Sequence, residues 1–419
     1  MVYQSATPES FLDDFRTQMK TKLVKEMVGK KLDQLRTPSL VINRSILQRN
    51  CTALGKITTG LKNTRIRVHV KTHKSVEGAR IQLENAQTDA IVVSTLPEAY
   101  AMINSDLTSS GLLKQASIFY KFDDIFDLSS KVDVFQIFID NLATLEALEE
   151  YCKSTGSQKK LNVFLKVDCG YGRAGVPIND EKTLALAKRL SDSPHVVFTG
   201  IYTHAGHSYS SQSSDEALEY LKTECDVARQ FRDYFVSNGV PINYVSIGAT
   251  PTVKAITAFM DHLDMDYILR DIDEVHAGAF AFLDRQQVAT GLGTYHDVAI
   301  SVACRIASVY EDRKSVLIDG GALAFSKDTA PQGGFGYVID PAVKDDVEIL
   351  ASVTKVSQEH GILQHLDETT LSRPELRIGE LVRVVPNHCC LAAACHLYYL
   401  VVENDSDVVV DVWVPVRGW

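Results

Sequence analysis

Several features that define other protein classes are missing from this chain. It has no long basic run, and 53 acidic residues outnumber 43 basic ones, which gives a net charge of −10. No apolar run approaches the roughly 18 residues of a membrane span. The first residues include Glu9, Asp13 and Asp14 and no apolar core of a signal peptide. We therefore expect a cytoplasmic protein that binds neither nucleic acid nor membrane.

Cysteine is sparse and shows no spacing typical of a disulfide-rich fold. The chain has eight cysteines among 419 residues, and it lacks the secretory features that favour disulfides. We expect free thiols or metal ligands instead. Three cysteines, Cys389, Cys390 and Cys395, lie close together in the sequence, and this cluster needs a chemical explanation.

Composition and length are those of an ordinary globular chain. Hydrophobic residues make up 45% and charged residues 23%, close to the averages of folded proteins, so extensive disorder is excluded. The 419 residues exceed the roughly 100–200 of a typical domain, and we expect two domains.

Short strands and longer helices alternate between residues 60 and 280. Runs rich in β-branched and aromatic residues begin near Ile66, Ala90, Ser117, Val134, Asn162, Val197, Tyr244 and Asp273. Apolar residues at helical spacing fill intervals such as 142–153 and 214–239. Eight such units match the count and length of a closed α/β barrel, with an open doubly wound sheet as the alternative.

After residue 290 the pattern changes to strands alone, which predicts a separate β-domain. Strand-like runs occupy residues 298–309, 315–319, 347–356, 380–385, 397–402 and 408–414. An earlier run at 37–42 has strand character as well and can join this domain. The predicted organisation is a TIM-type (β/α) barrel of residues 46–290 and an all-β domain of residues 291–419, joined by the N-terminal segment 1–45.

Lys71 is the first candidate for chemistry. If the first strand continues through residue 74, alternation puts His69, Lys71 and His73 on one face, so that Lys71 points into the barrel. Active sites of such barrels lie at the C-terminal ends of the strands. A lysine just past a strand is more often a surface residue, and Lys71 becomes a candidate through the groups predicted around it.

Small-residue turns follow the last two predicted strands. The first ends its strand at Gly248 and begins a helix with Thr250, so that backbone N–H groups, a hydroxyl and a helix N-terminus can bind phosphate. A simple capped helix start is the alternative. The second turn contains Gly278 and Ala279. It follows strand eight, and the loops after strands seven and eight of such barrels often bind phosphate together.

Aromatic and cationic side chains follow strands five and six. Tyr202 and His204 share one face, and Gly206 lets the chain turn so that Tyr209 folds back to the barrel mouth. They can hydrogen-bond a polar ring or form a packed core cluster. Arg173 follows strand five on a glycine-rich loop, where it can point into the site or form a loop ion pair.

Five motifs, in this order, resemble those of the eukaryotic D-serine dehydratases. They occupy residues 70–74, 168–176, 202–209, 248–252 and 386–390, and the resemblance extends from about Thr37 to the C-terminus. That family groups with the D-threonine aldolases among the alanine-racemase-like pyridoxal phosphate enzymes. The resemblance implies a homodimeric lyase that uses pyridoxal phosphate and zinc to convert D-serine to pyruvate and ammonia.

The resemblance also implies roles for single residues. Lys71 would carry the cofactor as a Schiff base. Further cofactor contacts implied by the family are Tyr202, Tyr209, Thr250, Gly278 and Ala279. Candidate contacts from the strand-end patterns are Gly248, Arg173, His204 and His276. His276 stands where alanine racemases have an arginine facing the pyridine nitrogen, which leaves the partner of that nitrogen open.

The family implies His388 and Cys390 as zinc ligands. If the chain stays extended there, these two side chains face one way and Cys389 the other, and an imidazole with a thiolate suits zinc. Two protein ligands leave coordination positions for water and substrate. Cys395 and His396 would complete a four-ligand structural site, although the spacing lacks a tight C-x-x-C knuckle. Buried thiols without metal are the remaining alternative.

The implied chemistry is an α,β-elimination. Lys71 takes the α-proton, the cofactor ring delocalises the charge, and zinc activates the β-hydroxyl as a leaving group. A D-threo-3-hydroxyaspartate dehydratase would share nearly every motif, whereas a D-threonine aldolase pairs its metal histidine with aspartate where this chain has Cys390. A non-catalytic pyridoxal phosphate carrier would lack the β-domain. His360 is expected in the core, with a place near the metal as the alternative.

Overall fold

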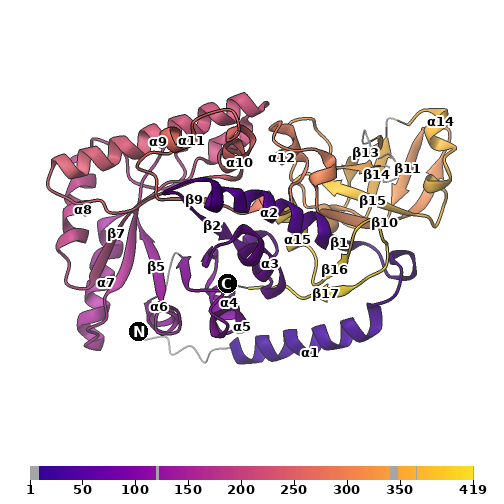
Figure 1. The fold of residues 1–419 in the computed structure, drawn as a ribbon. Coiled ribbons are helices and arrows are strands. Elements are labelled where there is room, and N and C mark those ends of the chain that lie inside the picture. The colour runs from indigo at the N-terminus through magenta and orange to yellow at the C-terminus, as the bar shows by residue number, and fades with distance from the viewer. Residues whose placement is uncertain (1–8, 119–121, 340–347, 365, 419) are drawn as a thin grey trace. The chain divides into compact units, whose positions relative to one another are not determined.

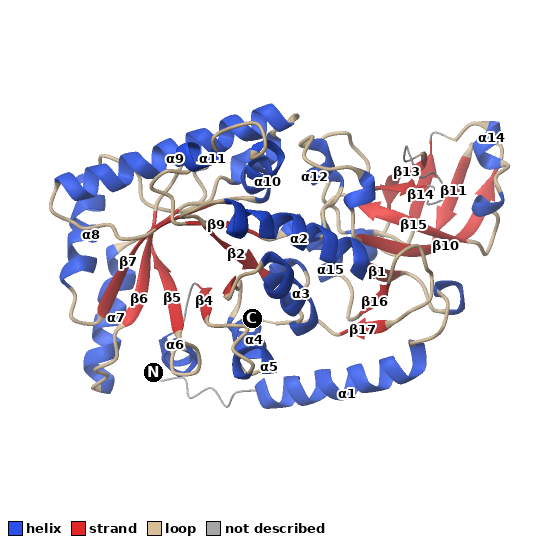
Figure 2. Cartoon of the chain, viewed as in Figure 1, coloured by secondary structure: helices blue, strands red, loops and turns tan. Residues whose placement is uncertain are grey.

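The computed structural model describes residues 9–118, 122–339, 348–364 and 366–418. Its helices and strands are labelled in Figure 1 and coloured by type in Figure 2. In the described ranges, no helix is both long and apolar enough to cross a membrane.

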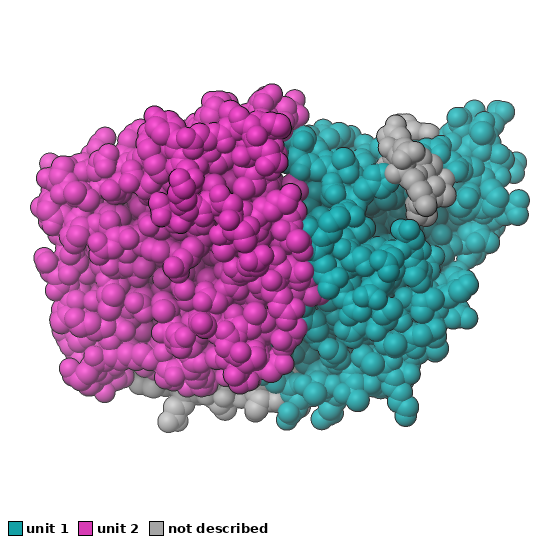
Figure 3. Space-filling model, in the orientation of Figure 1, with its two compact units in different colours: residues 1–50, 72–77, 281–416 teal, residues 51–71, 78–280, 417–419 magenta. Residues whose placement is uncertain are grey.

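The chain divides into two compact units (Figure 3). The sheet unit consists of Met1–Asn50, Thr72–Glu77 and Ala281–Val416, and the barrel unit of Cys51–Lys71, Gly78–Phe280 and the last residues Arg417–Trp419. One boundary between the units falls after Lys71, so that Lys71 belongs to the barrel unit and Thr72 to the sheet unit.

Eight parallel strands close into a barrel, as predicted, and exclude the open sheet. The strands are β2 (Arg65–His69), β3 (Ala90–Val92), β4 (Gln115–Ile118), β5 (Val134–Ile139), β6 (Leu161–Lys166), β7 (Val196–Tyr202), β8 (Val245–Ile247) and β9 (Glu274–Ala277). Strand β2 pairs with both β3 and β9, which closes the ring. All eight predicted strands are present.

Helices connect the barrel strands in the βα order that a parallel barrel requires (Figure 2). Helix α2 (Arg44–Gly60) precedes the first barrel strand, and the connecting helices are α3 (Val76–Ala86), α4 (Leu96–Ile103), α5 (Asp106–Ser109), α6 (Phe122–Leu128), α7 (Leu142–Thr155), α8 (Glu181–Asp192), α9 (Ser214–Ser237), α10 (Thr250–Phe259) and α11 (Met265–Ile268). Their ends have local causes. Helix α7 begins after Asn141, whose side chain accepts the Thr144 N–H, and ends at Gly156, whose φ is +68°.

The sheet unit is built on one nine-stranded sheet in the order β11-β14-β13-β12-β15-β10-β1-β16-β17. Its strands are β1 (Ser39–Asn43), β10 (Ile300–Tyr310), β11 (Ser315–Ile318), β12 (Gly336–Ile339), β13 (Ile349–Val356), β14 (Gly361–Gln364), β15 (Leu381–Pro386), β16 (Tyr399–Val402) and β17 (Asp411–Trp413). Strand β1 pairs with β10 and β16. The run at 37–42 therefore joins the β-domain, as predicted.

The expectation of strands alone after residue 290 was wrong. The segment also forms short helices, namely α13 (Ala322–Phe325), α14 (Glu368–Leu371) and α15 (Cys389–Ala394). Helix α12 (Arg285–Ala289) immediately precedes that boundary. Helices of four to six residues are too short for apolar periodicity to reveal them.

The 19-residue helix α1 (Glu9–Met27) was also not predicted. Its last turns pack Leu23, Val24 and Met27 against a core cluster that includes Leu32 and Val41. The helix has few apolar residues along most of its length. Its periodic signal is therefore weak, and packing within the sheet unit stabilises it.

Candidate active site

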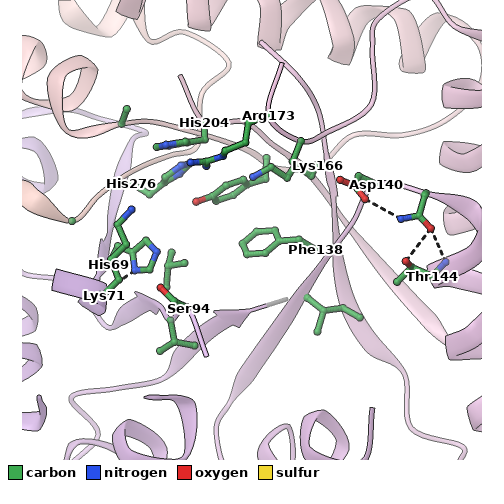
Figure 4. Close-up of a pocket in the computed structure, with 18 of the residues that line it drawn as sticks. His69, Lys71, Ser94, Phe138, Asp140, Thr144, Lys166, Arg173, His204 and His276 are labelled. Atoms are coloured by element: carbon green, nitrogen blue, oxygen red, sulfur yellow. Dashed lines mark hydrogen bonds between the residues drawn. The ribbon is translucent and has the colours of Figure 1, made fainter. Parts of the chain in front are cut away.

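A cavity of about 780 Å³ lies at the C-terminal ends of the barrel strands. All of its lining residues belong to the barrel unit. Figure 4 shows His69 and Lys71 on one side, and Lys166, Arg173, His204 and His276 along another. A cavity of this size at these strand ends is where a TIM-type barrel binds its ligand.

Lys71 lines this cavity but does not lie on a strand. Strand β2 ends at His69, and Val70–Thr72 form a 3₁₀ turn in which the Lys71 N–H donates to His69 Nδ1 at 3.3 Å. The alternation expected through residue 74 was therefore wrong. His73 lies in the sheet unit, where its Nδ1 is 3.1 Å from Ser75 Oγ.

The turn after β8 has the features of an anion cradle. Helix α10 begins at Thr250, and the buried Thr250 Oγ1 has no hydrogen-bond partner among the described residues. Gly248 has a φ of +146°, and a Cβ there would lie 2.4 Å from His276 O. A helix N-terminus with an unused hydroxyl in a cavity is suited to a phosphate. Gly278 also lines the cavity, whereas Ala279 is buried in the following 3₁₀ turn.

Glu224 holds this turn in place through hydrogen bonds, and it was not predicted from the sequence. Its Oε1 accepts hydrogen bonds from Thr203 Oγ1 at 2.6 Å and from the backbone N–H groups of Ala205 and Gly248, each at 3.0 Å. Its Oε2 accepts from Thr252 Oγ1 at 3.2 Å. Burial raises the pKa of Glu224. This one side chain on α9 ties the loop after β7 to the loop after β8.

Two histidines and a tyrosine form one wall of the cavity. The rings of Tyr202 and His276 stack with centroids 4.0 Å apart and planes 10° from parallel. His204 Nδ1 lies 2.8 Å from Gly248 O. Burial and the nearby Lys71 lower the pKa of His204 to about 3, and burial lowers that of His276 well below its ordinary value. Both imidazoles are therefore neutral at physiological pH.

Two cationic side chains follow one another in this part of the barrel: Lys166 is the last residue of β6, and Arg173 lies in the loop after it. Lys166 and Arg173 both line the cavity. Burial and the neighbouring Arg173 lower the pKa of Lys166 to about 8. Lys166 was not singled out from the sequence, because a lysine at a strand end has no distinguishing pattern. Tyr209, in the 3₁₀ turn Gly206–Ser210, also reaches the cavity.

His388 and Cys390 lie in the sheet unit. The segment is not extended as expected, because His388 is the N-cap residue of α15 and Cys389 begins that helix. His388 Nδ1 lies 2.8 Å from Asp328 Oδ2, and both side chains are 32% exposed. Cys390 Sγ lies 3.1 Å from Oγ1 of Thr72, the residue that follows Lys71 in the sequence.

A four-ligand structural site is not formed in the described part of the chain. No three His, Cys, Asp or Glu side chains there come together in a metal-binding arrangement. Cys395 Sγ and His396 Nε2 instead contact the carbonyl oxygens of Leu391 and Ala324, at 3.4 and 3.0 Å. Those two residues are therefore held by the main chain.

Asp284 fixes the start of α15. Its fully buried carboxylate accepts the N–H of Cys389 at 2.7 Å and that of Gln287 at 2.8 Å. Asp284 and Asp328 come from sequence positions distant from His388 and were not predicted. The expectation of a core position for His360 was wrong, because this residue is exposed in the turn between β13 and β14. None of the eight cysteines is in a disulfide.

Two family models together match most of the chain. The model for the alanine racemase N-terminal domain matches residues 42–270, which contain the barrel strands β2 to β8. A model for a serine dehydratase domain matches residues 299–402, which contain the His388–Cys390 segment. Lys71 and Thr250 thus lie in the first match and His388 and Cys390 in the second, whereas His276, Gly278 and Ala279 lie between the two.

Relatives and solved structures agree with these models. The chain is 35% identical to D-serine dehydratase of Schizosaccharomyces pombe over 96% of each sequence. It is 32% identical to D-serine dehydratase of Saccharomyces cerevisiae, over 93% of this chain and 98% of that protein. The structure of D-threo-3-hydroxyaspartate dehydratase from Delftia sp. HT23 superimposes with a TM-score of 0.78 at 27% identity, over 93% and 100% of the two chains. The chain therefore belongs to the D-serine dehydratase family of enzymes, as its motifs predicted.

Proposed function

We propose that this protein is a pyridoxal phosphate- and zinc-dependent D-serine dehydratase, which converts D-serine to pyruvate and ammonia. One observation carries the proposal: the cavity that contains the Lys71 amine also contains the unpartnered Thr250 hydroxyl at the N-terminus of α10. An amine and an anion cradle in one cavity are the two groups needed to hold an aldehyde that bears a phosphate. The identity to D-serine dehydratases supports the substrate.

The residues present fit pyridoxal phosphate. Thr250 has an unused hydroxyl, and Gly248 and Gly278 leave room that a side chain would fill. We propose that Thr250, Gly278 and the Ala279 N–H hold the phosphate and that Lys71 holds the aldehyde carbon. Tyr202 and Tyr209 contact the ring. The bound cofactor supplies a conjugated ring that withdraws electrons from the carbon bearing the substrate amine.

We assign different roles toward the substrate to three cationic side chains, Lys71, Lys166 and Arg173. Lys71 Nζ, once the substrate amine has replaced it on the aldehyde carbon, accepts the proton from the α-carbon. Lys166 and Arg173 attract the substrate carboxylate, because both are cations that line the cavity. The neutral His204 is positioned by its hydrogen bond to Gly248 O. The elimination then releases the β-oxygen, and addition of water to the released enamine gives pyruvate and ammonia.

The donor set in the sheet unit fits zinc. His388 offers an imidazole and Cys390 a thiolate, and Asp328 binds the other imidazole nitrogen, as a carboxylate does for many histidine ligands. Two protein ligands leave positions for water and substrate. A relative of this chain, D-threo-3-hydroxyaspartate dehydratase, was solved as a cysteine-to-alanine variant in a metal-free form, at 26% identity. Zinc, when bound, stabilises oxygen that is becoming hydroxide.

A substrate panel tests the proposal. Purified protein is incubated with D-serine, L-serine, D-threonine and D-threo-3-hydroxyaspartate, and keto acid, aldehyde and ammonia are assayed. Equal amounts of pyruvate and ammonia from D-serine alone are expected. Aldehyde from D-threonine would identify an aldolase, and bound cofactor without turnover of any substrate would identify a carrier. The proposed homodimer is measured by light scattering on the same preparation.

D-threo-3-hydroxyaspartate is the second candidate substrate. It carries two carboxylates, and the two cations Lys166 and Arg173 in one cavity would suit both. The chain is 28% identical to D-threo-3-hydroxyaspartate dehydratase of Delftia sp. over 92% of its length. Faster turnover of the dicarboxylate than of D-serine would favour this candidate.

A further inference from the structure

A chain of hydrogen bonds crosses the inside of the barrel and ends at His276. Arg67 Nε lies 2.8 Å from Glu274 Oε1, and Ser246 Oγ donates to the same oxygen at 2.7 Å. Tyr244 OH donates to Glu274 Oε2 at 3.2 Å. Ser246 Oγ also lies 3.0 Å from His276 Nδ1. Arg67, Glu274, Ser246 and His276 are all at most 3% exposed, so water does not compete for these bonds.

The direction of each bond follows from the charge at the start of the chain. Arg67 stays protonated, and its burial requires a negative partner, which makes Glu274 a carboxylate that only accepts. The single hydroxyl proton of Ser246 therefore points to Glu274. Ser246 Oγ can then only accept from His276, so that Nδ1 of His276 carries the proton.

This direction decides the chemistry of the other ring nitrogen. A neutral imidazole with a proton on Nδ1 has a lone pair on Nε2. Burial, followed by the nearby His204 and Lys166, lowers the pKa of His276, so a second proton is disfavoured. His276 Nε2 is buried and has no hydrogen-bond partner among the described residues, and His276 lines the cavity. The cavity wall therefore presents an acceptor that needs a donor.

We propose that His276 accepts a hydrogen bond from the ring N–H of bound pyridoxal phosphate, and that Ser246 and Glu274 are positioning residues that fix it in this acceptor form. The inference rests on the proposed function and adds the protonation state of the cofactor. With Thr250 assigned to the phosphate and Lys71 to the aldehyde carbon, the ring nitrogen is the donor left on the far side of the ring from the aldehyde. A protonated nitrogen withdraws electrons more strongly, which aids removal of the α-proton.

The first part of the test uses protein without cofactor. Nuclear magnetic resonance of ¹⁵N-labelled histidine side chains should place the proton of His276 on Nδ1. Ser246→Ala removes the acceptor and should shift the ring toward the Nε2–H form, and Ser246→Thr, which keeps a hydroxyl, should restore the Nδ1–H form. The matched control is Tyr244→Phe, which removes a different donor from Glu274 and should leave the tautomer unchanged. An Nε2–H tautomer in the unaltered protein would overturn the inference.

The second part uses the cofactor and its 1-deaza analogue, in which carbon replaces the ring nitrogen. The ring nitrogen of ¹⁵N-labelled pyridoxal phosphate should resonate as protonated pyridine, and the analogue should bind about 10-fold to 100-fold more weakly, the effect of losing one hydrogen bond to a charged group. His276→Leu should remove this difference between the two ligands. An unprotonated ring nitrogen, or equal binding to the unaltered protein, would contradict the inference. Failure of the unaltered protein to take up pyridoxal phosphate would instead overturn the proposed function.

Discussion

The barrel cavity and the His388–Cys390 segment hold their polar groups in different ways. In the barrel, Glu224 and Glu274 are each 1% exposed, and each accepts several hydrogen bonds from neighbouring strands and loops. In the sheet unit, His388 and its partner Asp328 are each 32% exposed. Buried carboxylates fix the barrel groups before any ligand binds, whereas the proposed zinc ligand His388 and its partner Asp328 remain partly exposed to solvent.

This difference fits two different chemical roles for the two regions. A preorganised cavity favours the proton transfer at the α-carbon, which requires fixed geometry. An open pair of ligands favours exchange of water, substrate and leaving group on a metal. Substitutions in one region should therefore disable that region and leave the other intact.

Lys71→Ala should have the largest effect on the barrel side. Turnover of D-serine should fall by about 10²–10⁴-fold or more, the range that a general base contributes, and the visible absorption of the bound cofactor should be lost because its covalent anchor is gone. Absorption spectra and pyruvate assays measure both effects. Lys62→Ala is the control, since this side chain is 83% exposed. A coloured and active Lys71→Ala protein would contradict the assignment.

His388→Ala and Cys390→Ala should disable the other region alone. Each should abolish pyruvate release and lower the zinc content, because two protein ligands are too few to lose one. Cofactor absorption and circular dichroism should remain unchanged. The control is Cys395→Ala, whose thiol lies 3.4 Å from the carbonyl oxygen of Leu391. Loss of cofactor from the His388 or Cys390 variant would mean that the two regions are not separable.

Glu224→Ala should damage the cavity without touching substrate. The change leaves the N–H groups of Ala205 and Gly248 and the hydroxyl of Thr203 without their buried acceptor. Because each such group costs about 1–3 kcal/mol, the free energy of unfolding should fall by about 3 kcal/mol or more, and cofactor affinity should fall with it. Urea unfolding measures the first and dialysis the second. Glu219→Ala, at a more exposed position on α9, should be nearly silent.

Thr250→Val should have the smallest effect and should be confined to the cofactor. Its hydroxyl has no hydrogen-bond partner in the part of the chain that the structure describes, so stability should not fall. Cofactor binding should weaken by about 1–3 kcal/mol, the value of one bond to a charged group. Fluorescence titration and thermal unfolding on the same protein separate the two. Unchanged cofactor affinity would move the phosphate away from α10.

The sequence predicted the features that follow from local pattern. Apolar runs located all eight barrel strands, and small residues at Gly248 and Thr250 located the start of α10. The pattern failed where the backbone leaves regular geometry. Strand β2 ends at His69 rather than continuing past Lys71, and α15 begins where an extended chain was expected. Lys71 still lines the cavity because the 3₁₀ turn keeps it at the strand end.

Residues that act through distant partners were not predictable. Glu224 lies on a long helix where an acidic residue is usually exposed, and only the fold brings it beneath Gly248. Asp328 and His388 are 60 positions apart. One sequence contains no signal that relates such pairs, because the contact depends on tertiary packing rather than on spacing along an element.

Zinc removal tests most directly whether the metal acts on the β-hydroxyl while Lys71 acts on the α-proton. Pyruvate release and uptake of solvent deuterium at the α-carbon of D-serine are measured on zinc-loaded and chelator-treated protein with matching circular dichroism. Chelation should abolish pyruvate release but preserve the fold and the cofactor absorption. Deuterium uptake should continue, because we expect it to depend on Lys71 in the barrel cavity. Full pyruvate release without metal would contradict the role of zinc at the β-hydroxyl, and unfolding on chelation would make the metal structural.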